Sequence, residues 1–345
     1  MIKVLADNSF PDLDDFFGSN FQMTRYASRD DLLTQIIDQD ILLCRSTLAV
    51  TAALLETSKI SCVATASSGI DHLDLSYLTA REITVCDAKG ANAKAVADYV
   101  SACVASLQRQ GHHFGLRAAV VGVGVVGALV VARLQALGFE VLMFDPLRAL
   151  QDPQFISCEH KALFDCDLLC LHANLHDEGP YASRHFLDAA FFARLKPQTV
   201  IINAARGDIV DEAALLACEQ RMIYCTDVYA NEPHINPGVV AYATICTPHI
   251  AGHSIEARHR ALQLLRHKIH ILFGMHLNND SVFSILGSGG APVETTAILS
   301  LYDPDQETQA LKQSRALSKT FTALRKAHCH RHDFDCERID LTAVS

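Results

Sequence analysis

The sequence has no tryptophan, no CxxC pair and no apolar segment long enough to cross a bilayer. Its longest apolar segment has 15 residues, lies between Arg117 and Arg133 and contains three glycines. That is shorter than the about 20 residues that a transmembrane helix needs. The opening segment, MIKVLADNSFPDLDD, is acidic and lacks the apolar stretch of a signal peptide. We therefore expect a cytoplasmic protein with no membrane partner.

An excess of basic residues is also missing. The 29 Lys and Arg residues stand against 39 Asp and Glu residues, which gives a formal net charge of −10. This balance disfavours nucleic acid as a partner, and it means that an anionic substrate needs a locally positive pocket.

Cysteine is abundant, but its placement does not indicate disulfides. Most of the 12 cysteines lie inside apolar segments such as ILLC, which ends at Cys44, so we expect reduced core residues. The segment HCHRHDFDC (328–336) brings Cys and His together, but its spacing matches no standard zinc site. We predict no metal site there and a solvated polar tail.

Short apolar segments alternate with helical stretches through most of the chain. This alternation is typical of a parallel sheet with helices on both faces. The first series of expected strands consists of MIKVLAD, DILLCRS, ISCVATAS and EITVCDA. A second series begins at Leu116 and consists of AAVVGV, EVLMFD, DLLCLH, TVIINAA, MIYCTDV and ATICTP. The predicted fold is α/β, with two doubly wound parallel-sheet (Rossmann-like) domains and a small C-terminal extension.

The expected division of the chain follows from two amphipathic stretches. The segment 94–110 has one apolar stripe and predicts a helix that opens the second domain. A second helix, at about 255–273, can carry the chain back to the first. We expect a first domain of residues 1–93 completed by 256–281, a second of 94–255, and an extension of 282–345. In the extension we expect the linker GSGGAP, one helical stretch at 306–327 and a short strand, ERIDLTAV.

A glycine-rich turn, GVGVVG, follows the strand AAVV and opens a helix. Gly122 permits a tight turn, Gly124 lets a pyrophosphate approach the backbone, and Gly127 lets helix and strand pack closely. The helix N-terminus favours phosphates. Asp145 ends the next strand, where a carboxylate binds a ribose and repels a 2′-phosphate, so NAD is favoured over NADP; the nearby Arg148 keeps NADP open. The alternative is a glycine turn without a ligand.

Three later segments place polar residues at expected strand ends, and the carboxyl ends of parallel strands share one edge. NAARGD contains Arg206, TDVYANEP contains Asp227 and Glu232, and TPHIAG contains His249. Hydride transfer from an alcohol needs a base such as neutral imidazole, and a carboxylate on the other ring nitrogen fixes its tautomer. A guanidinium can grip the carboxylate of a 2-hydroxy acid. The alternative is that these residues have no catalytic role. His249 would then fill a loop, Arg206 would be a surface charge and Glu232 would lie in a turn.

Hydroxyl groups at two strand ends of the first domain could hold a phosphate. Arg45 and Ser46 follow one expected strand, and Ser67, Ser68 and Gly69 follow the next. Their hydroxyl and backbone N–H groups suit an anion, although each serine could equally be an ordinary strand-end cap.

Together these motifs resemble the D-2-hydroxyacid dehydrogenase family over residues 1–280. CRST, TASSGIDHLD, FDPLRA, DEGPY and TPHIAGHSIEARHR resemble a branch that oxidises a phosphorylated hydroxy acid in pyridoxal 5′-phosphate biosynthesis. The resemblance implies NAD as cofactor, a small-molecule phosphorylated hydroxy acid as substrate, and a homodimer formed through the C-terminal extension. That extension is shorter here than in the branch, which puts dimerisation through it in question.

The resemblance also implies roles for individual residues. Arg206 and Glu232 would be catalytic, and His249 would be the proton donor or acceptor. Substrate contacts would come from Arg45, Ser46, Ser67 and His253. NAD contacts would come from Gly122, Gly124, Val126, Gly127, Asp145, Ala173, Ala204, Ala205, Arg206, Asp227 and Gly252. Three residues depart from the family pattern: Ser67 and Ala173 stand where it has threonine, and His253 where it has tyrosine.

The leading hypothesis is an NAD-dependent dehydrogenase of a phosphorylated 2-hydroxy acid, with His249 as proton acceptor. One alternative is a dehydrogenase for another 2-hydroxy acid, such as 3-phosphoglycerate, glyoxylate or hydroxypyruvate. A second is a non-catalytic NAD(H)-sensing module of the same fold, against which the set of Arg206, Glu232 and His249 argues.

Overall fold

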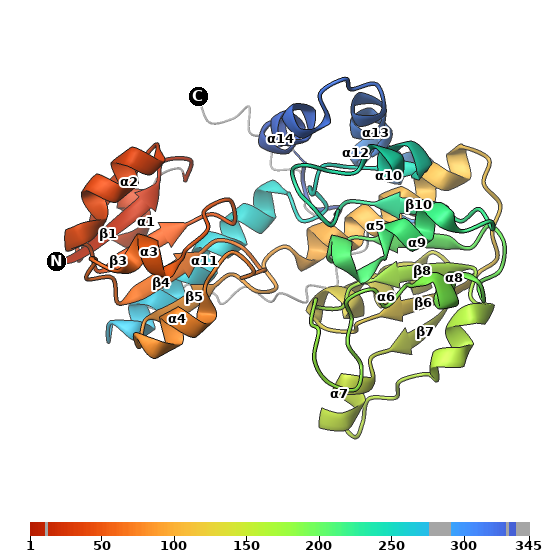
Figure 1. The fold of residues 1–345 in the computed structure, drawn as a ribbon, viewed down its shortest axis with the longest axis horizontal. Helices are drawn as coiled ribbons and strands as arrows, with labels where there is room; N and C mark the ends of the chain where they lie inside the picture. Colours follow the sequence, from red (N-terminus) through yellow and green to blue (C-terminus); the bar gives the residue numbers. More distant parts are fainter. Residues whose placement is uncertain (11–12, 276–290, 329–330, 336–345) are drawn as a thin grey trace. The chain divides into compact units, whose positions relative to one another are not determined.

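The computed structural model describes residues 1–10, 13–275, 291–328 and 331–335. The chain forms two compact units (Figure 1). The first contains Met1–Asn92 and the segment from Glu256, and the second contains Ala93–Ile255 and the C-terminal segment. Within the described ranges, no helix has both the length and the apolar character that spanning a membrane requires.

The first unit is built on a five-stranded parallel sheet of order β2-β1-β3-β4-β5. The strands are β1 (Ile2–Asp7), β2 (Phe21–Tyr26), β3 (Ile41–Cys44), β4 (Cys62–Thr65) and β5 (Thr84–Asp87). The sequence predicted all of these except β2. β2 is an edge strand whose residues between Phe21 and Tyr26 are only partly buried or exposed, so it lacks the continuous apolar run that marks a central strand.

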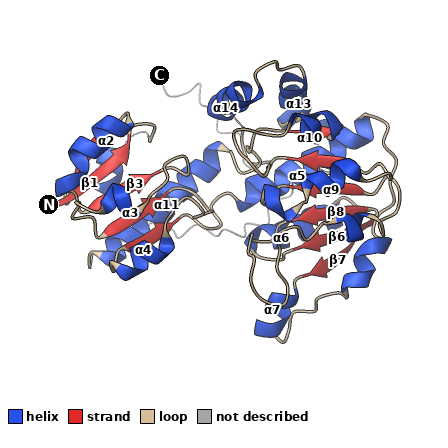
Figure 2. Cartoon of the chain, in the orientation of Figure 1, coloured by secondary structure: helices blue, strands red, loops and turns tan. Residues whose placement is uncertain are grey.

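Helices cover both faces of this sheet (Figure 2). They are α1 (Leu13–Phe17), α2 (Arg29–Gln35), α3 (Ala52–Leu55), α4 (Leu75–Ala80) and α11 (Ile255–Leu272), with a 3₁₀ turn at Ile36–Asp38. Leu265 and Ile269 of α11 are buried in the same cluster as residues of β1, β3 and β4. Lys268 of α11 donates to the carboxylate of Asp87 at 2.6 Å. A helix distant in sequence therefore completes the first unit.

The second unit contains a six-stranded parallel sheet of order β11-β10-β9-β8-β6-β7. The strands are β6 (Arg117–Val121), β7 (Glu140–Phe144), β8 (Leu168–Leu171), β9 (Val200–Asn203), β10 (Ile223–Thr226) and β11 (Ile245–Cys246). β8, β9 and β10 are buried at every position, as expected for parallel strands covered on both faces.

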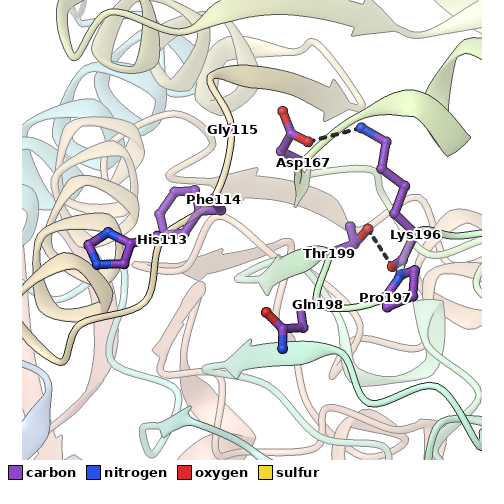
Figure 3. Close-up of a pocket in the computed structure, with 8 residues that line it drawn as sticks. All are labelled: His113, Phe114, Gly115, Asp167, Lys196, Pro197, Gln198 and Thr199. Carbon is purple, nitrogen blue, oxygen red and sulfur yellow. Dashed lines mark hydrogen bonds and ion pairs between the residues drawn. The ribbon is translucent and has the colours of Figure 1, made fainter.

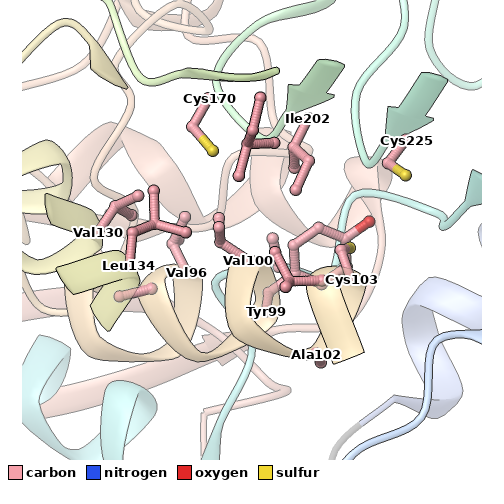
Figure 4. Packing of buried hydrophobic residues seen from close by; sticks show 14 of the residues in the cluster. Val96, Tyr99, Val100, Ala102, Cys103, Val130, Leu134, Cys170, Ile202 and Cys225 are labelled. Atoms are coloured by element: carbon pink, nitrogen blue, oxygen red, sulfur yellow. The ribbon is translucent and has the colours of Figure 1, made fainter. Parts of the chain in front are cut away.

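Both faces of the second sheet are packed by helices. On one face lie α5 (Ala93–Arg109), α6 (Val125–Ala136) and α12 (Thr295–Leu301). Figure 4 shows α5 pointing Val100 and Cys103 toward Cys170, Ile202 and Cys225 of the strands. The other face is covered by α8 (Ala189–Phe192), α9 (Glu212–Ala217), α10 (Pro237–Tyr242), α13 (Asp305–Lys312) and α14 (Leu317–Ala327), while α7 (Pro146–Gln151) follows β7. The predicted fold class, two Rossmann-like α/β domains with a helical C-terminal segment, is confirmed.

The C-terminal segment differs from its prediction in two respects. Instead of one helical stretch at 306–327, the structure has α13 and α14, separated by a turn at Ser314, and α12 before them. The prediction of a solvated polar tail is wrong for the described residues 331–335, because Arg331, Asp333 and Phe334 are buried. Arg331 Nη2 donates to the backbone carbonyls of Ala95 and Ala251, so this nitrogen is satisfied inside the unit rather than by water.

Several sequence predictions in this segment concern residues outside the described ranges. They are most of the GSGGAP linker, the strand ERIDLTAV, and Cys329, His330 and Cys336. The cysteines that are described are all free, and no group of three or more potential metal ligands occurs among the described residues.

Candidate active site

The glycine-rich turn joins β6 to α6 with the geometry that its sequence predicts. Gly122 has a φ of +85°, and a Cβ there would overlap the backbone of Ala173. A Cβ at Gly127 would overlap the carbonyl oxygen of Gly122. Gly124, the N-cap of the 12-residue α6, is exposed, and a Cβ on it would meet nothing within 4 Å. Open space at a helix N-terminus with unpaired N–H groups fits a pyrophosphate.

Asp145 follows β7 and its carboxylate faces this turn. Oδ2 accepts from the backbone N–H of Val123 at 2.8 Å, and Oδ1 accepts from that of Arg148 at 3.0 Å. The Arg148 guanidinium donates to the carbonyl of Val123 at 2.7 Å and lies over the ring of Phe155 at 4.3 Å. The half-buried carboxylate therefore adjoins the end of the turn, where the ribose of a dinucleotide is expected.

His172 directly follows β8 and lies beside the same turn. Both of its ring nitrogens are buried and have no hydrogen-bond partner among the described residues. Burial lowers the pKa of His172 to about 3, so the ring is neutral in the folded protein.

We expect His172 to make the protein less stable as the pH falls. In the unfolded chain a histidine binds a proton with a pKa of about 6.5, whereas the folded chain excludes it down to about pH 3. The unfolded state therefore binds more protons between these values, and stability falls with decreasing pH. Between pH 7 and pH 5 the loss should be about 2 kcal/mol. His172→Leu should remove this component from urea unfolding curves, and His234→Leu at an exposed position should not; equal slopes for both variants would contradict the assignment.

The strands β9, β10 and β11 are adjacent and parallel, so the residues that follow them lie at one edge of the sheet. Arg206 comes three residues after the end of β9, Asp227 directly follows β10, and His249 comes three residues after β11. This carboxyl edge is also where β6 leads into the glycine turn. The sheet topology thus brings the predicted catalytic segments to the edge that carries the predicted cofactor turn.

The buried Asp227 organises the loop that carries His249. Its Oδ1 accepts from the Thr247 hydroxyl at 2.7 Å and from the N–H of Ile250 at 2.8 Å, and its Oδ2 accepts from the N–H of Ala251 at 2.8 Å. Burial raises the pKa of Asp227 although these donors oppose that rise. Its carboxylate is directed at the loop, and the predicted contact with NAD stays a prediction.

Glu232 and His249 form a carboxylate–imidazole pair. His249 Nδ1 lies 2.6 Å from Glu232 Oε2, and the N–H of Tyr229 donates to Oε1 at 3.0 Å. Burial tends to raise the pKa of Glu232, but His249, the Tyr229 N–H and the charge of Arg325 outweigh it, so the pKa lies below its ordinary value. An ionised carboxylate on Nδ1 keeps the proton there and leaves Nε2 to act as a base. His249 has a φ of +57°, which is uncommon for a residue other than glycine.

Arg206 adjoins the turn that supports this pair. Asn203 fixes its backbone, donating to the Arg206 carbonyl at 3.0 Å and accepting from the Ala205 N–H at 3.2 Å. A Cβ on Gly207 would overlap the peptide between Tyr229 and Ala230. Arg206 is therefore the residue before the one that packs against Tyr229. The N–H of Tyr229 in turn donates to Glu232. Ala204 and Ala205 line the same strand end.

His253 and Gly252 continue the His249 loop, but His253 faces the C-terminal segment. Its carbonyl accepts from Arg331 Nε at 3.0 Å, and its ring lies 6.3 Å from that of His328. Burial, followed by the charges of Arg325, His249, His328 and Arg331, lowers the pKa of His253 well below its ordinary value. Sequence reasoning missed this contribution of the C-terminal segment because no motif marks Arg325 or Arg331.

The remaining predicted substrate residues lie in the first unit. Arg45 and Ser46 are exposed and follow β3, and Ser67 is half-buried and follows β4. Because β3 and β4 are adjacent and parallel, these residues share the carboxyl edge of that sheet. Arg45 Nε lies 3.2 Å from Asp7 Oδ2, at the end of β1. Their roles stay predictions.

A pocket in the second unit lies at the opposite sheet edge (Figure 3). Its lining residues include Gly115, Asp167 and Thr199, which precede β6, β8 and β9, and Lys196, which pairs with Asp167 at 2.9 Å. These residues are at the amino ends of the strands, so this pocket is not part of the candidate active site.

Comparison with known proteins agrees with this geometry. Residues 93–251 match the family described as D-isomer specific 2-hydroxyacid dehydrogenase, NAD binding domain. The whole chain is similar to the erythronate-4-phosphate dehydrogenase of Legionella pneumophila strain Philadelphia 1, at 44% identity over 96% of this chain and 95% of the relative. It is also similar to that of Coxiella burnetii strain RSA 493, at 35% identity over 99% and 96% of the two chains.

Solved structures show the fold. The 2-hydroxyacid dehydrogenase from Ketogulonicigenium vulgare Y25 matches with a TM-score of 0.65 at 24% identity, over 81% of this chain and 98% of that one. The NAD⁺-bound 3-phosphoglycerate dehydrogenase of Entamoeba histolytica matches with a TM-score of 0.65 at 20% identity, over 83% and 99% of the two chains.

Proposed function

Because the chain belongs to the D-isomer specific 2-hydroxyacid dehydrogenase family, we propose that it is an NAD-dependent erythronate-4-phosphate dehydrogenase. It oxidises 4-phospho-D-erythronate to 3-hydroxy-2-oxo-4-phosphobutanoate, a step of pyridoxal 5′-phosphate biosynthesis. The contact of His249 Nδ1 with Glu232 at 2.6 Å, on the sheet edge that carries the glycine turn, is the observation on which the assignment depends. It supplies the base that such an oxidation needs.

The residues of the second unit suit a single proton transfer. Bound NAD would supply the hydride acceptor. Nε2 of His249 takes the proton of the substrate C2 hydroxyl, and Glu232 holds the other ring nitrogen and stabilises the imidazolium that forms. Arg206 holds the substrate carboxylate through paired hydrogen bonds. Asp227 fixes the loop that carries His249, because its carboxylate accepts from the N–H groups of Ile250 and Ala251.

Other residues would hold NAD. The N-terminus of α6 at Gly124, with Val126 and Gly127 behind it, would take the pyrophosphate, and Asp145 would take the adenosine ribose. Ala173, Ala204, Ala205, Asp227 and Gly252 would line the rest of the cofactor. Arg45, Ser46, Ser67 and His253 are the proposed substrate contacts.

The organisation of the chain completes the proposal. Residues 1–93 with 256–281 would form the substrate domain, and 94–255 the NAD-binding domain. Residues 282–345 would be an extension that serves a homodimer in the cytoplasm. Support comes from the family resemblance and, for the NAD-binding domain, from the match of residues 93–251. Sedimentation of the purified protein measures the oligomeric state.

Formation of NADH from a substrate panel tests the activity. We expect turnover of 4-phosphoerythronate with NAD to exceed that of unphosphorylated erythronate, 3-phosphoglycerate and glycerate, and to exceed turnover with NADP. The selectivity should appear in kcat/KM, because binding of the remote phosphate can also orient the reacting carbon. Equal rates with the unphosphorylated acid would remove the phosphate-specific assignment. A protein that binds NADH but oxidises none of the panel would instead be an NAD(H)-sensing module.

A further inference from the structure

A guanidinium from the C-terminal segment lies against the proposed catalytic pair. Arg325 Nη1 of α14 is 3.7 Å from Glu232 Oε2, the same oxygen that contacts His249 Nδ1. Both side chains are largely shielded, with 25% of Arg325 and 18% of Glu232 exposed. Partial burial strengthens an ion pair relative to one at the surface.

The packing of α14 fixes Arg325 at this position. Phe321, one helical turn earlier and on the same face, is buried and meets the ring of Tyr229 edge-on, with centroids 5.9 Å apart. Tyr229 in turn donates its N–H to Glu232 Oε1. The aromatic contact and the ion pair therefore connect α14 to the same short turn, so Arg325 is placed by packing and does not simply extend from the surface.

Titratable groups lie near the pair on several elements. Asp227 approaches from the end of β10, His253 from the loop itself, and Glu212 from α9, where it accepts the N–H of Ala230. Arg206 adjoins the Tyr229 turn through Gly207. Against this background Arg325 adds a positive charge on the carboxylate oxygen that His249 uses.

We propose that Arg325 is a positioning residue for proton transfer, acting through Glu232 and not through the substrate. It keeps Glu232 ionised and in place, and its positive charge offsets part of the negative charge that the carboxylate presents to His249. An oxidation needs the imidazole neutral before it accepts a proton. This inference rests on the proposed function and adds that the C-terminal segment takes part in setting the pH range of the enzyme.

The pH dependence of kcat/KM in Arg325→Met tests the proposal. Loss of the positive charge should move the acid limb of the profile to higher pH by about half to one unit, less than the about 1–3 units that a charge in close contact produces, because Arg325 acts through Glu232. Turnover at neutral pH should fall several-fold with little change in NADH affinity. Arg325→Lys should restore most of the position of the limb. Lys326→Met is the matched control, because it removes an exposed positive charge from the next position of α14.

Three outcomes separate the possibilities. A uniform loss of activity with an unmoved acid limb would mean that Arg325 only packs α14, and a rise in KM alone would mean that it touches substrate; both overturn the proposal. A wild-type protein without turnover would overturn the proposed function.

NMR titration of the His249 ring in wild type and Arg325→Met then still decides the role of Arg325, because it needs no substrate. A curve displaced to higher pH supports the role, and an unchanged curve rejects it.

Discussion

Replacing His249 with alanine should lower kcat by about 10²- to 10⁴-fold, the usual contribution of a general acid–base group. The reason is the contact with Glu232 at 2.6 Å, which commits Nδ1 to the carboxylate and leaves Nε2 for the substrate proton. NADH affinity should change little, because the glycine turn that would hold the pyrophosphate follows β6, whereas His249 follows β11. Steady-state kinetics and a fluorescence titration with NADH measure the two quantities.

Two further variants make this result specific. His249→Gln keeps a polar side chain but cannot accept the proton, so it should be nearly as impaired as the alanine variant. His234→Ala removes an exposed histidine close to Glu232 in sequence and should retain full turnover. If His249→Ala kept wild-type kcat, the proton acceptor would have to be another group.

Replacing Asp227 with alanine should cost about 2–4 kcal/mol of folding free energy and most of the activity. It leaves the N–H groups of Ile250 and Ala251 and the Thr247 hydroxyl without their acceptor, and each unsatisfied buried donor costs about 1–3 kcal/mol. The sum is reduced because burying the carboxylate is itself unfavourable, as its raised pKa indicates. Activity falls as well, because the same bonds hold His249 at a positive φ.

Urea unfolding followed by circular dichroism measures the loss in Asp227→Ala. Asp211→Ala is a suitable reference, because Asp211 caps α9 by accepting the N–H of Ala214 at 3.0 Å, and loss of such a cap costs about 1 kcal/mol. Asp227→Asn should lie between the two, since the amide can accept some of these bonds but not all. A loss in Asp227→Ala no larger than in Asp211→Ala would show that the loop holds His249 without this carboxylate.

Local features of the chain were sufficient to predict much of the fold. Ten of the eleven strands found in the described part of the chain coincide with apolar segments recognised in the sequence, because buried parallel strands are apolar throughout. The glycine turn was predicted from its spacing together with the strand before it, the helix after it and Asp145, and Gly122 and Gly127 do have backbone neighbours that exclude a Cβ. β2 escaped prediction because an edge strand tolerates the polar residues that hide its pattern.

The pairing of Glu232 with His249 was predicted as a chemical possibility, and parallel pairing of β10 with β11 explains why it occurs. Asp227 was predicted to contact NAD, which stays a prediction, and the structure adds that its carboxylate binds the His249 loop. Nothing local distinguishes these two uses, because both place an aspartate at the end of a strand.

The sequence by itself determined the two parallel sheets, the glycine turn and the edge at which Arg206, Glu232 and His249 gather. These depend on residue spacing within single elements and on the rule that parallel strands share one carboxyl edge. Only the tertiary structure decided that Arg331, Asp333 and Phe334 are buried and that Arg325 meets Glu232. The physical reason is that a polar segment can satisfy its hydrogen bonds in water or against another part of the chain. Which of the two occurs depends on packing between elements far apart in sequence.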